Sequence, residues 1–256
     1  MSLSPCTRSH IRLPRSAPAA PTTPNTIVRA LMSRTEPLGT VFVATRQGTG
    51  PNNADAVSVF TASDGTVAAA LVDLAGHDEG APVLAERLAW AAAAIGARKG
   101  AVAGVLTAAA LVAEPVPGAG PDGAVVVAVV CPGRDVEICV AGDAVAYGWD
   151  GRHLIARTVP QGVGERLHVS LATAVAPTVV PSGAPPEELL ILLSDGADPG
   201  RDRLEALARE HTADPQALAD ALVAAAGPDT KGERDDATTL VISANRPVRE
   251  FRRPAR

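Results

Sequence analysis

Apolar and polar residues follow one another in blocks along residues 40–243, and these blocks predict strands and helices in a definite order. The clearest block is Thr66–His77, TVAAALVDLAGH, in which an apolar run lies between turn residues at Asp64-Gly65 and Gly76. Such a run is typical of a strand buried on both faces. The Ser63–Gly65 turn predicts a hairpin to the preceding strand. In all, strands are expected at 40–46, 56–62, 66–73, 123–130, 136–142, 144–149, 153–158, 189–194 and 238–243.

Helical patterns separate these strands in two pairs. An alanine-rich helix is expected to begin near Pro82, with Asp78 and Glu79 in its first turn, and to run to about residue 97. A second follows at 101–113, and two more at about 203–210 and 215–226, the last with Asp214 as N-cap. The segment 161–186 has little pattern beyond one short strand near 172–175. Runs of strands alternating with helix pairs predict an α+β fold, two packed sheets with helices outside.

Four aspartates stand at the ends of the predicted strands. Asp73 and Asp195 follow apolar runs, and Asp55 and Asp235 precede them. A carboxylate in such a position is costly to bury unless a cation holds it. If the four strand ends meet, they form an oxygen-rich pocket, and carboxylates without His or Cys suit Mg²⁺ or Mn²⁺ better than zinc. Two such ions would activate water for displacement at phosphorus.

Composition excludes several other classes of function. The net charge of -5 gives no electrostatic case for binding nucleic acid or an anionic membrane. No stretch has the length and apolarity of a membrane span or signal segment, and three cysteines lack metal-ligand spacing. We therefore expect a cytoplasmic protein. Residues 1–38 are expected to be a disordered tail, 39–245 one folded domain and 246–256 a basic C-terminal tail.

Five motifs taken together resemble one family. They are, in order, NNADA (52–56), VDLAGH (72–77), AGDAVAYGWDG (141–151), LLSDG (192–196) and RDDATTLVI (234–242). The set is similar to the metal-dependent protein serine/threonine phosphatases of type 2C, and the resemblance covers roughly residues 40–243. It implies a four-layer αββα sandwich of two antiparallel sheets flanked by helix pairs. The segment before LLSDG is short, so the substrate-contacting flap of larger members is expected to be absent.

The resemblance also implies a site. Asp73 would bridge two Mn²⁺ or Mg²⁺ ions, Asp195 and Asp235 would hold one of them, and the backbone carbonyl of Leu74 would hold the other. Asp55 would orient metal-bound water, and Asp143 matches the position of a third, weaker metal. A phosphorylated protein would be the substrate, and a Ser/Thr kinase or its targets are further candidate partners. His77 and Arg46 complete the candidate catalytic set.

Each residue also has a plainer interpretation. A single aspartate is more often a turn residue or helix cap than a ligand. His77 would either assist proton transfer to the leaving group or pack against the following helix. Arg46 would either grip phosphate or simply end an exposed strand.

Departures from the family pattern leave two further questions open. Ala54, Gly50 and Leu74 replace a glutamate, a phosphate-gripping arginine and a glycine. They favour a second hypothesis, an inactive pseudophosphatase that binds a regulator. The D-x-x-G-H spacing at Asp73–His77 resembles the sporulation and stress-regulator branch, whereas the Gly142-Asp143 pair resembles the ordinary bacterial branch.

Overall fold

Two five-stranded sheets form the centre of the molecule in the computed structural model, which describes residues 39–112, 121–132, 136–163, 166–173, 180–184, 189–228 and 232–244. One sheet has the order β1-β12-β11-β6-β7 and the other β10-β5-β4-β3-β2, and neighbouring strands in both are antiparallel. The strands of the first sheet are β1 (Gly39–Arg46), β12 (Ala237–Ala244), β11 (Leu189–Leu193), β6 (Val145–Trp149) and β7 (Leu154–Ala156). Those of the second are β10 (Val180–Ala184), β5 (Val136–Ala141), β4 (Gly123–Val130), β3 (Val67–Leu74) and β2 (Asp55–Thr61).

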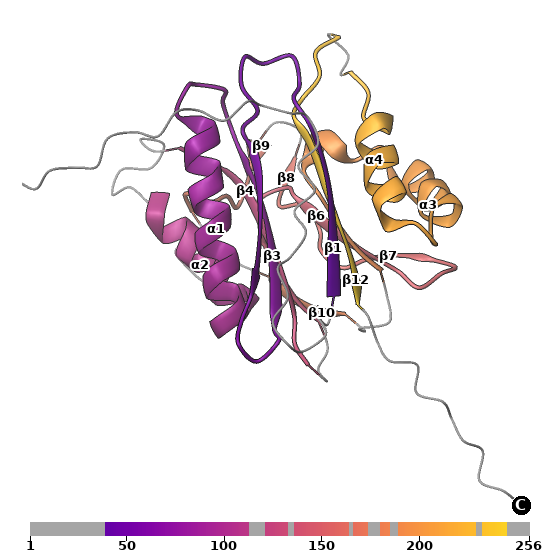
Figure 1. Cartoon of the computed structure of the whole chain (residues 1–256). Helices are drawn as coiled ribbons and strands as arrows, with labels where there is room; N and C mark the ends of the chain where they lie inside the picture. The colour runs from indigo at the N-terminus through magenta and orange to yellow at the C-terminus, as the bar shows by residue number, and fades with distance from the viewer. Residues whose placement is uncertain are drawn as a thin grey trace, which may run out of the picture.

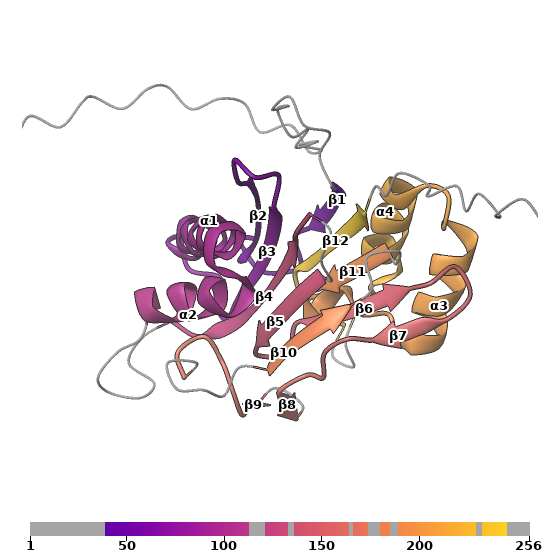
Figure 2. The ribbon, with the colours of Figure 1, turned by 90° about the horizontal axis from the view of Figure 1, so that it is seen from below.

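Helix pairs cover the outer face of each sheet, which gives the four layers visible in Figure 1. Helices α1 (Ala81–Lys99) and α2 (Ala101–Val112) pack on the sheet that contains β3, and α3 (Arg201–Glu210) and α4 (Pro215–Ala225) pack on the other. The view from below in Figure 2 shows the same separation of the two helix pairs. The predicted αββα sandwich is therefore correct.

Three apolar layers hold the sandwich together. Leu71, Val126 and Ile138 of one sheet meet Leu192 and Leu240 of the other in the layer between the sheets. The layer beneath α1 and α2 consists largely of alanine and valine, and leucines are more frequent in the layer beneath α3 and α4. Small side chains allow helices to approach a sheet closely, so this aromatic-poor chain still fills its core.

Most element boundaries match the sequence pattern. Asp214 does cap α4, because its carboxylate accepts a hydrogen bond from the backbone N–H of Ala217. The acids before α1 were misplaced: Asp78 and Glu79 lie outside the helix, and Asp78 Oδ1 instead accepts from the N–H groups of Gly80 and Ala81. This arrangement satisfies N–H groups at the helix start without placing an acid in its first turn.

The poorly patterned segment was the least well predicted. A short strand was expected near 172–175, but residues 171–173 form a turn and the remainder lies outside the described residues. Within the described part of this segment, β10 lies at the edge of its sheet beside β5 and was not predicted. A two-stranded ribbon of β8 (Gly162–Val163) and β9 (Arg166–Leu167) was also not predicted.

Two predictions concern residues outside the described part. The proposed tails, 1–38 and 246–256, both lie there.

Among the described residues, no helix is long and apolar enough to cross a membrane.

Candidate active site

The predicted metal-binding aspartates come together at one end of the sandwich. Asp55 begins β2 and lies directly opposite Asp73, near the end of β3. From the other sheet, Asp195 opens the 3₁₀ turn η1 (Asp195–Ala197) just after β11, and Asp235 precedes β12. Loss of water raises the pKa of Asp73 well above its ordinary value, and the charges of four other aspartates raise it further. Those four are Asp55, Asp195, Asp235 and Asp143.

Asp55 is the most constrained member of the group. Its Oδ2 accepts a hydrogen bond of 2.9 Å from Ser194 Oγ, which joins the two sheets. Its Oδ1 is buried and has no hydrogen-bond partner within the described chain. Burial raises the pKa of Asp55 to about 7, although the neighbouring hydroxyl groups of Thr238 and Ser194 lower it. A buried carboxylate oxygen with no partner indicates that something other than the chain completes this position.

The remaining three carboxyl groups lie at the rim. Burial and then the charge of Asp143 raise the pKa of Asp195, whereas a hydrogen bond with Asp73 lowers it. Burial is also the main reason that the pKa of Asp143 is raised, and the charge of Asp235 adds to it. For Asp235 the causes are burial and then the charge of Asp195. Like charges this close favour protons or cations between them.

The chemistry of this group fits a divalent cation. All five side chains offer hard oxygen donors, and one buried oxygen lacks a partner. The ligands are not fully arranged in advance, since no three acid, His or Cys side chains of the described residues surround a single point as a metal site would require. Binding would therefore have to draw the carboxylates closer together.

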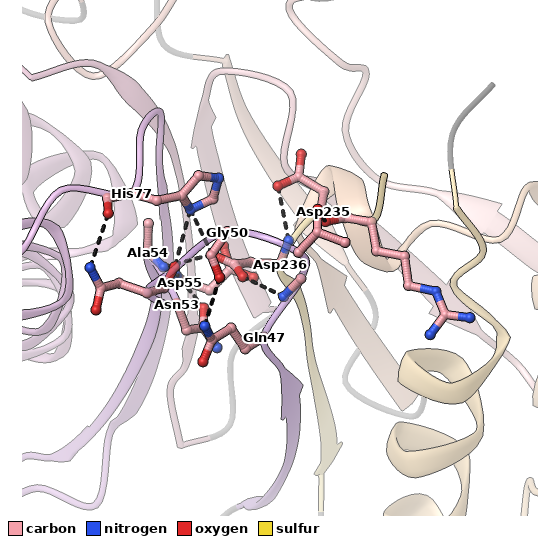
Figure 3. A network of polar contacts seen from close by, with 12 residues as sticks. Gln47, Gly50, Asn53, Ala54, Asp55, His77, Asp235 and Asp236 are labelled. Carbon is pink, nitrogen blue, oxygen red and sulfur yellow. Dashed lines mark hydrogen bonds and ion pairs between the residues drawn. The ribbon is translucent and has the colours of Figure 1, made fainter. Parts of the chain in front are cut away.

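His77 lies beside this group, in the loop between β3 and α1. Its Nδ1 is 3.1 Å from the backbone oxygen of Asn52 and 3.4 Å from Asp236 Oδ2. Asn52 in turn donates from Nδ2 to the His77 carbonyl at 3.0 Å. Figure 3 shows these contacts, with the second ring nitrogen on the side of Asp235. The position suits either proton transfer or packing, so the structure leaves both interpretations of His77 in place.

Arg46 is not brought into the carboxylate group. Its guanidinium donates to the backbone oxygens of Val223 and Ala226, at 2.8 and 3.1 Å, and so binds the end of α4. Leu74, the predicted carbonyl ligand, is the last residue of β3 and pairs with Gly123. Its side chain is buried, and its role as a ligand stays a prediction.

Two residues of this region were not among the predicted site residues. Ser194 connects Asp55 to the neighbouring sheet, because its Oγ also accepts from the N–H of Thr238 at 3.0 Å. Asp236 is 3% exposed and accepts hydrogen bonds from the loop that precedes β2. The only signal for Asp236 was its place beside Asp235, and Ser194 was visible only as the residue before Asp195.

Solved structures of similar fold were found among bacterial phosphatases. A Streptococcus agalactiae serine/threonine phosphatase has a TM-score of 0.65 at 14% identity, over 81% of this chain and 100% of that one. The serine/threonine phosphatase Stp1 from Staphylococcus aureus has a TM-score of 0.63 at 16% identity, over 84% and 100%. For the PPM Ser-Thr phosphatase MsPP from Mycobacterium smegmatis, in complex with cacodylate, the values are 0.59 and 20%, over 80% and 98%. At these identities the likeness shows the fold.

Sequence comparison identifies the branch. No relative among curated proteins matches the chain. The sequence model of the family described as Stage II sporulation protein E (SpoIIE) matches residues 63–245, more than half of the chain and all but one of the motifs. Of the two branches that the motifs left open, this match selects the one indicated by the spacing of Asp73 and His77. The chain therefore belongs to the SpoIIE family, within the type 2C-like phosphatase superfamily.

Proposed function

We propose that this protein is a metal-dependent phosphatase that removes phosphate from phosphoserine or phosphothreonine in a protein substrate. The observation that carries the proposal is the convergence of five aspartates from both sheets at one end of a phosphatase fold. A chain that binds no cation has no physical reason to keep these carboxylates together, because each raises the pKa of its neighbours and weakens the fold.

The proposed ligand assignment is the one that the family resemblance implies, and the positions of the carboxyl groups support it. Asp73 lies opposite Asp55 and beside Asp195, and it would be the residue that helps to hold both Mn²⁺ or Mg²⁺ ions, as the family resemblance implies. Asp195 and Asp235 would complete the coordination of one ion, and the Leu74 carbonyl would bind the other. Asp143 would be available to a third ion that binds more weakly. When bound, the ions would supply Lewis acidity that lowers the pKa of water and neutralises charge on phosphoryl oxygens.

The chain itself positions and transfers protons. Asp55, held by Ser194, would accept a hydrogen bond from the attacking water through its free Oδ1. His77 would donate a proton to the departing serine or threonine oxygen from its second ring nitrogen, which lies on the side of Asp235. Neither step needs a covalent intermediate with the protein, as expected where positioning and charge neutralisation supply the catalysis.

Specific observations favour a second function, that of a pseudophosphatase acting as a regulatory binding module. Arg46 donates its hydrogen bonds to the end of α4, Gly50 stands where the family has a phosphate-gripping arginine, and Ala54 stands where it has a glutamate. No three carboxylates of the described residues already form a ligand set. Under this hypothesis the fold would bind a kinase, a phosphoprotein or a regulator without turnover.

An activity assay separates the two functions. Hydrolysis of p-nitrophenyl phosphate and of a phosphothreonine peptide is measured against Mn²⁺ concentration, with Asp73→Asn and Asp195→Asn as inactive controls and Asp220→Asn as a surface control. The phosphatase proposal expects Mn²⁺-dependent turnover that both site substitutions remove and Asp220→Asn retains. Absence of turnover with every metal tried, in a protein that is folded, would leave the binding module.

A further inference from the structure

Asp236 has both carboxylate oxygens occupied by one loop. Oδ1 accepts from the backbone N–H of Gly48 and Oδ2 from that of Ala54, each at 2.7 Å. These donors lie at the two ends of the loop between β1 and β2, so a single carboxylate holds both ends. Asp55 follows Ala54 directly, and the loop therefore delivers Asp55 to the site in a fixed position.

The same carboxylate lies next to the ring of His77. Oδ2 of Asp236 and the backbone oxygen of Asn52 both face Nδ1, at 3.4 and 3.1 Å. A carbonyl oxygen only accepts, so these contacts are satisfied when Nδ1 carries the hydrogen. The other nitrogen, Nε2, is then the one presented toward Asp235, as Figure 3 shows.

Gly50 provides the space that the ring occupies. A Cβ atom on residue 50 would lie 2.7 to 2.9 Å from three atoms of the His77 ring. Real Cβ atoms are not found this close to other heavy atoms, so any side chain here would displace the ring. Gly48 is similarly confined, since its Cβ would come within 2.3 Å of the Arg234 oxygen. The loop, His77 and the segment before β12 thus form one tightly fitted unit.

We propose that Asp236 and Gly50 are positioning residues that fix the His77 ring with Nδ1 directed toward Asp236 and Nε2 toward the candidate metal site and the substrate. This inference rests on the proposed function, because it assigns His77 the task of protonating the leaving oxygen. It also gives the adjacent aspartates separate tasks: Asp235 belongs to the candidate metal site, and Asp236 orients the histidine beside it.

The test uses two substrates that differ in their need for a proton. A p-nitrophenolate ion leaves without protonation, whereas a threonine oxygen does not. We expect Gly50→Ala to lower kcat for a phosphothreonine peptide by about 10–100-fold and kcat for p-nitrophenyl phosphate by less than about threefold, with KM nearly unchanged. Asp236→Asn also loosens the loop that carries Asp55, so it should lower kcat for both substrates, and by about 10-fold more for the peptide. Asp220→Asn, an exposed aspartate on α4, is the matched control. Equal losses on both substrates would show that the two residues only maintain the fold, and would overturn the proposal.

A second measurement does not depend on activity. Nitrogen-15 NMR of histidine-labelled protein above pH 8 reports which ring nitrogen carries hydrogen, and His77→Gln assigns the signal. The proposal expects the Nδ1–H form in the wild-type protein and a shift toward the Nε2–H form in Asp236→Asn. Gly50→Ala, which leaves the carboxylate in place, should shift the signal in the same direction. An Nε2–H ring in the wild-type protein would contradict the positioning proposal even if the protein is an active phosphatase. An Nδ1–H ring without turnover would instead retain the geometry and refute the proposed function.

Discussion

Asp55 and Asp73 lie directly opposite each other on the neighbouring strands β2 and β3. Two like charges in this cross-strand position destabilise a sheet unless a proton or cation lies between them. The same pair of carboxylates therefore destabilises the metal-free fold and provides oxygen ligands for a cation.

The first consequence is an unusual dependence of stability on pH. Folding raises the pKa of Asp55 from 3.8 to about 7, mainly through burial. Because the folded state favours the protonated form, the stability that Asp55 contributes is complete below about pH 4 and is lost as pH rises through about 7. We expect the metal-free protein to be less resistant to urea at pH 8 than at pH 6. Asp55→Asn should reduce this difference, and an unchanged difference in the variant would assign the effect to other groups.

Removal of the opposing charge should stabilise the metal-free fold. Asp73→Asn relieves repulsion from four neighbouring carboxylates, so we expect its free energy of unfolding to rise by about 0.5–2 kcal/mol at pH 8. The same substitution should abolish the effect of Mn²⁺ on the melting temperature. Urea titrations without metal and thermal melts with Mn²⁺ measure the two effects. A destabilised Asp73→Asn protein would mean that the carboxylate has a structural partner.

Ser194 is expected to stabilise the contact between the two sheets. Ser194→Ala removes the donor to Asp55 Oδ2 and leaves the N–H of Thr238 without its acceptor. Since both groups are buried, the loss should cost about 1–3 kcal/mol in unfolding free energy. Ser58→Ala, on the same strand as Asp55 but outside this contact, is the control. Equal stability of Ser194→Ala and wild type would mean that water replaces the hydroxyl.

Arg46 should stabilise the fold through α4. Arg46→Gln removes the paired hydrogen bonds to Val223 and Ala226, which we expect to lower the unfolding free energy by about 1.5–3 kcal/mol. A role as a phosphate clamp would instead raise KM for a phosphopeptide at constant stability. Parallel urea titrations and steady-state kinetics distinguish these roles.

The site residues that sequence could identify were those that break an apolar pattern. Asp73 and Asp195 end apolar runs, and their convergence was predictable once the strands were placed. Ser194 and Asp236 gave no such signal, because their roles depend on contacts with residues 139 and 182 positions away. The contacts of Arg46 were not predictable either, because its place at the end of a strand does not indicate that its side chain will contact α4.

The strands of the fold were likewise predictable only where their sequence has a clear apolar pattern. Strong apolar runs such as β3 and β4 were placed from the sequence, whereas β10, with the sequence VPSGA, has little strand character. Its proline and glycine are tolerated because the strand lies at a sheet edge. The two-residue strands β8 and β9 are too short for any periodicity to appear.

The most direct test of the account is calorimetric titration of the metal-free protein with Mn²⁺. We predict saturable binding at about neutral pH with at least two sites per chain, and loss of those sites in both Asp73→Asn and Asp195→Asn. Heats no larger than those of dilution in a folded wild-type protein, or undiminished binding in both variants, would contradict a metal centre built from these aspartates.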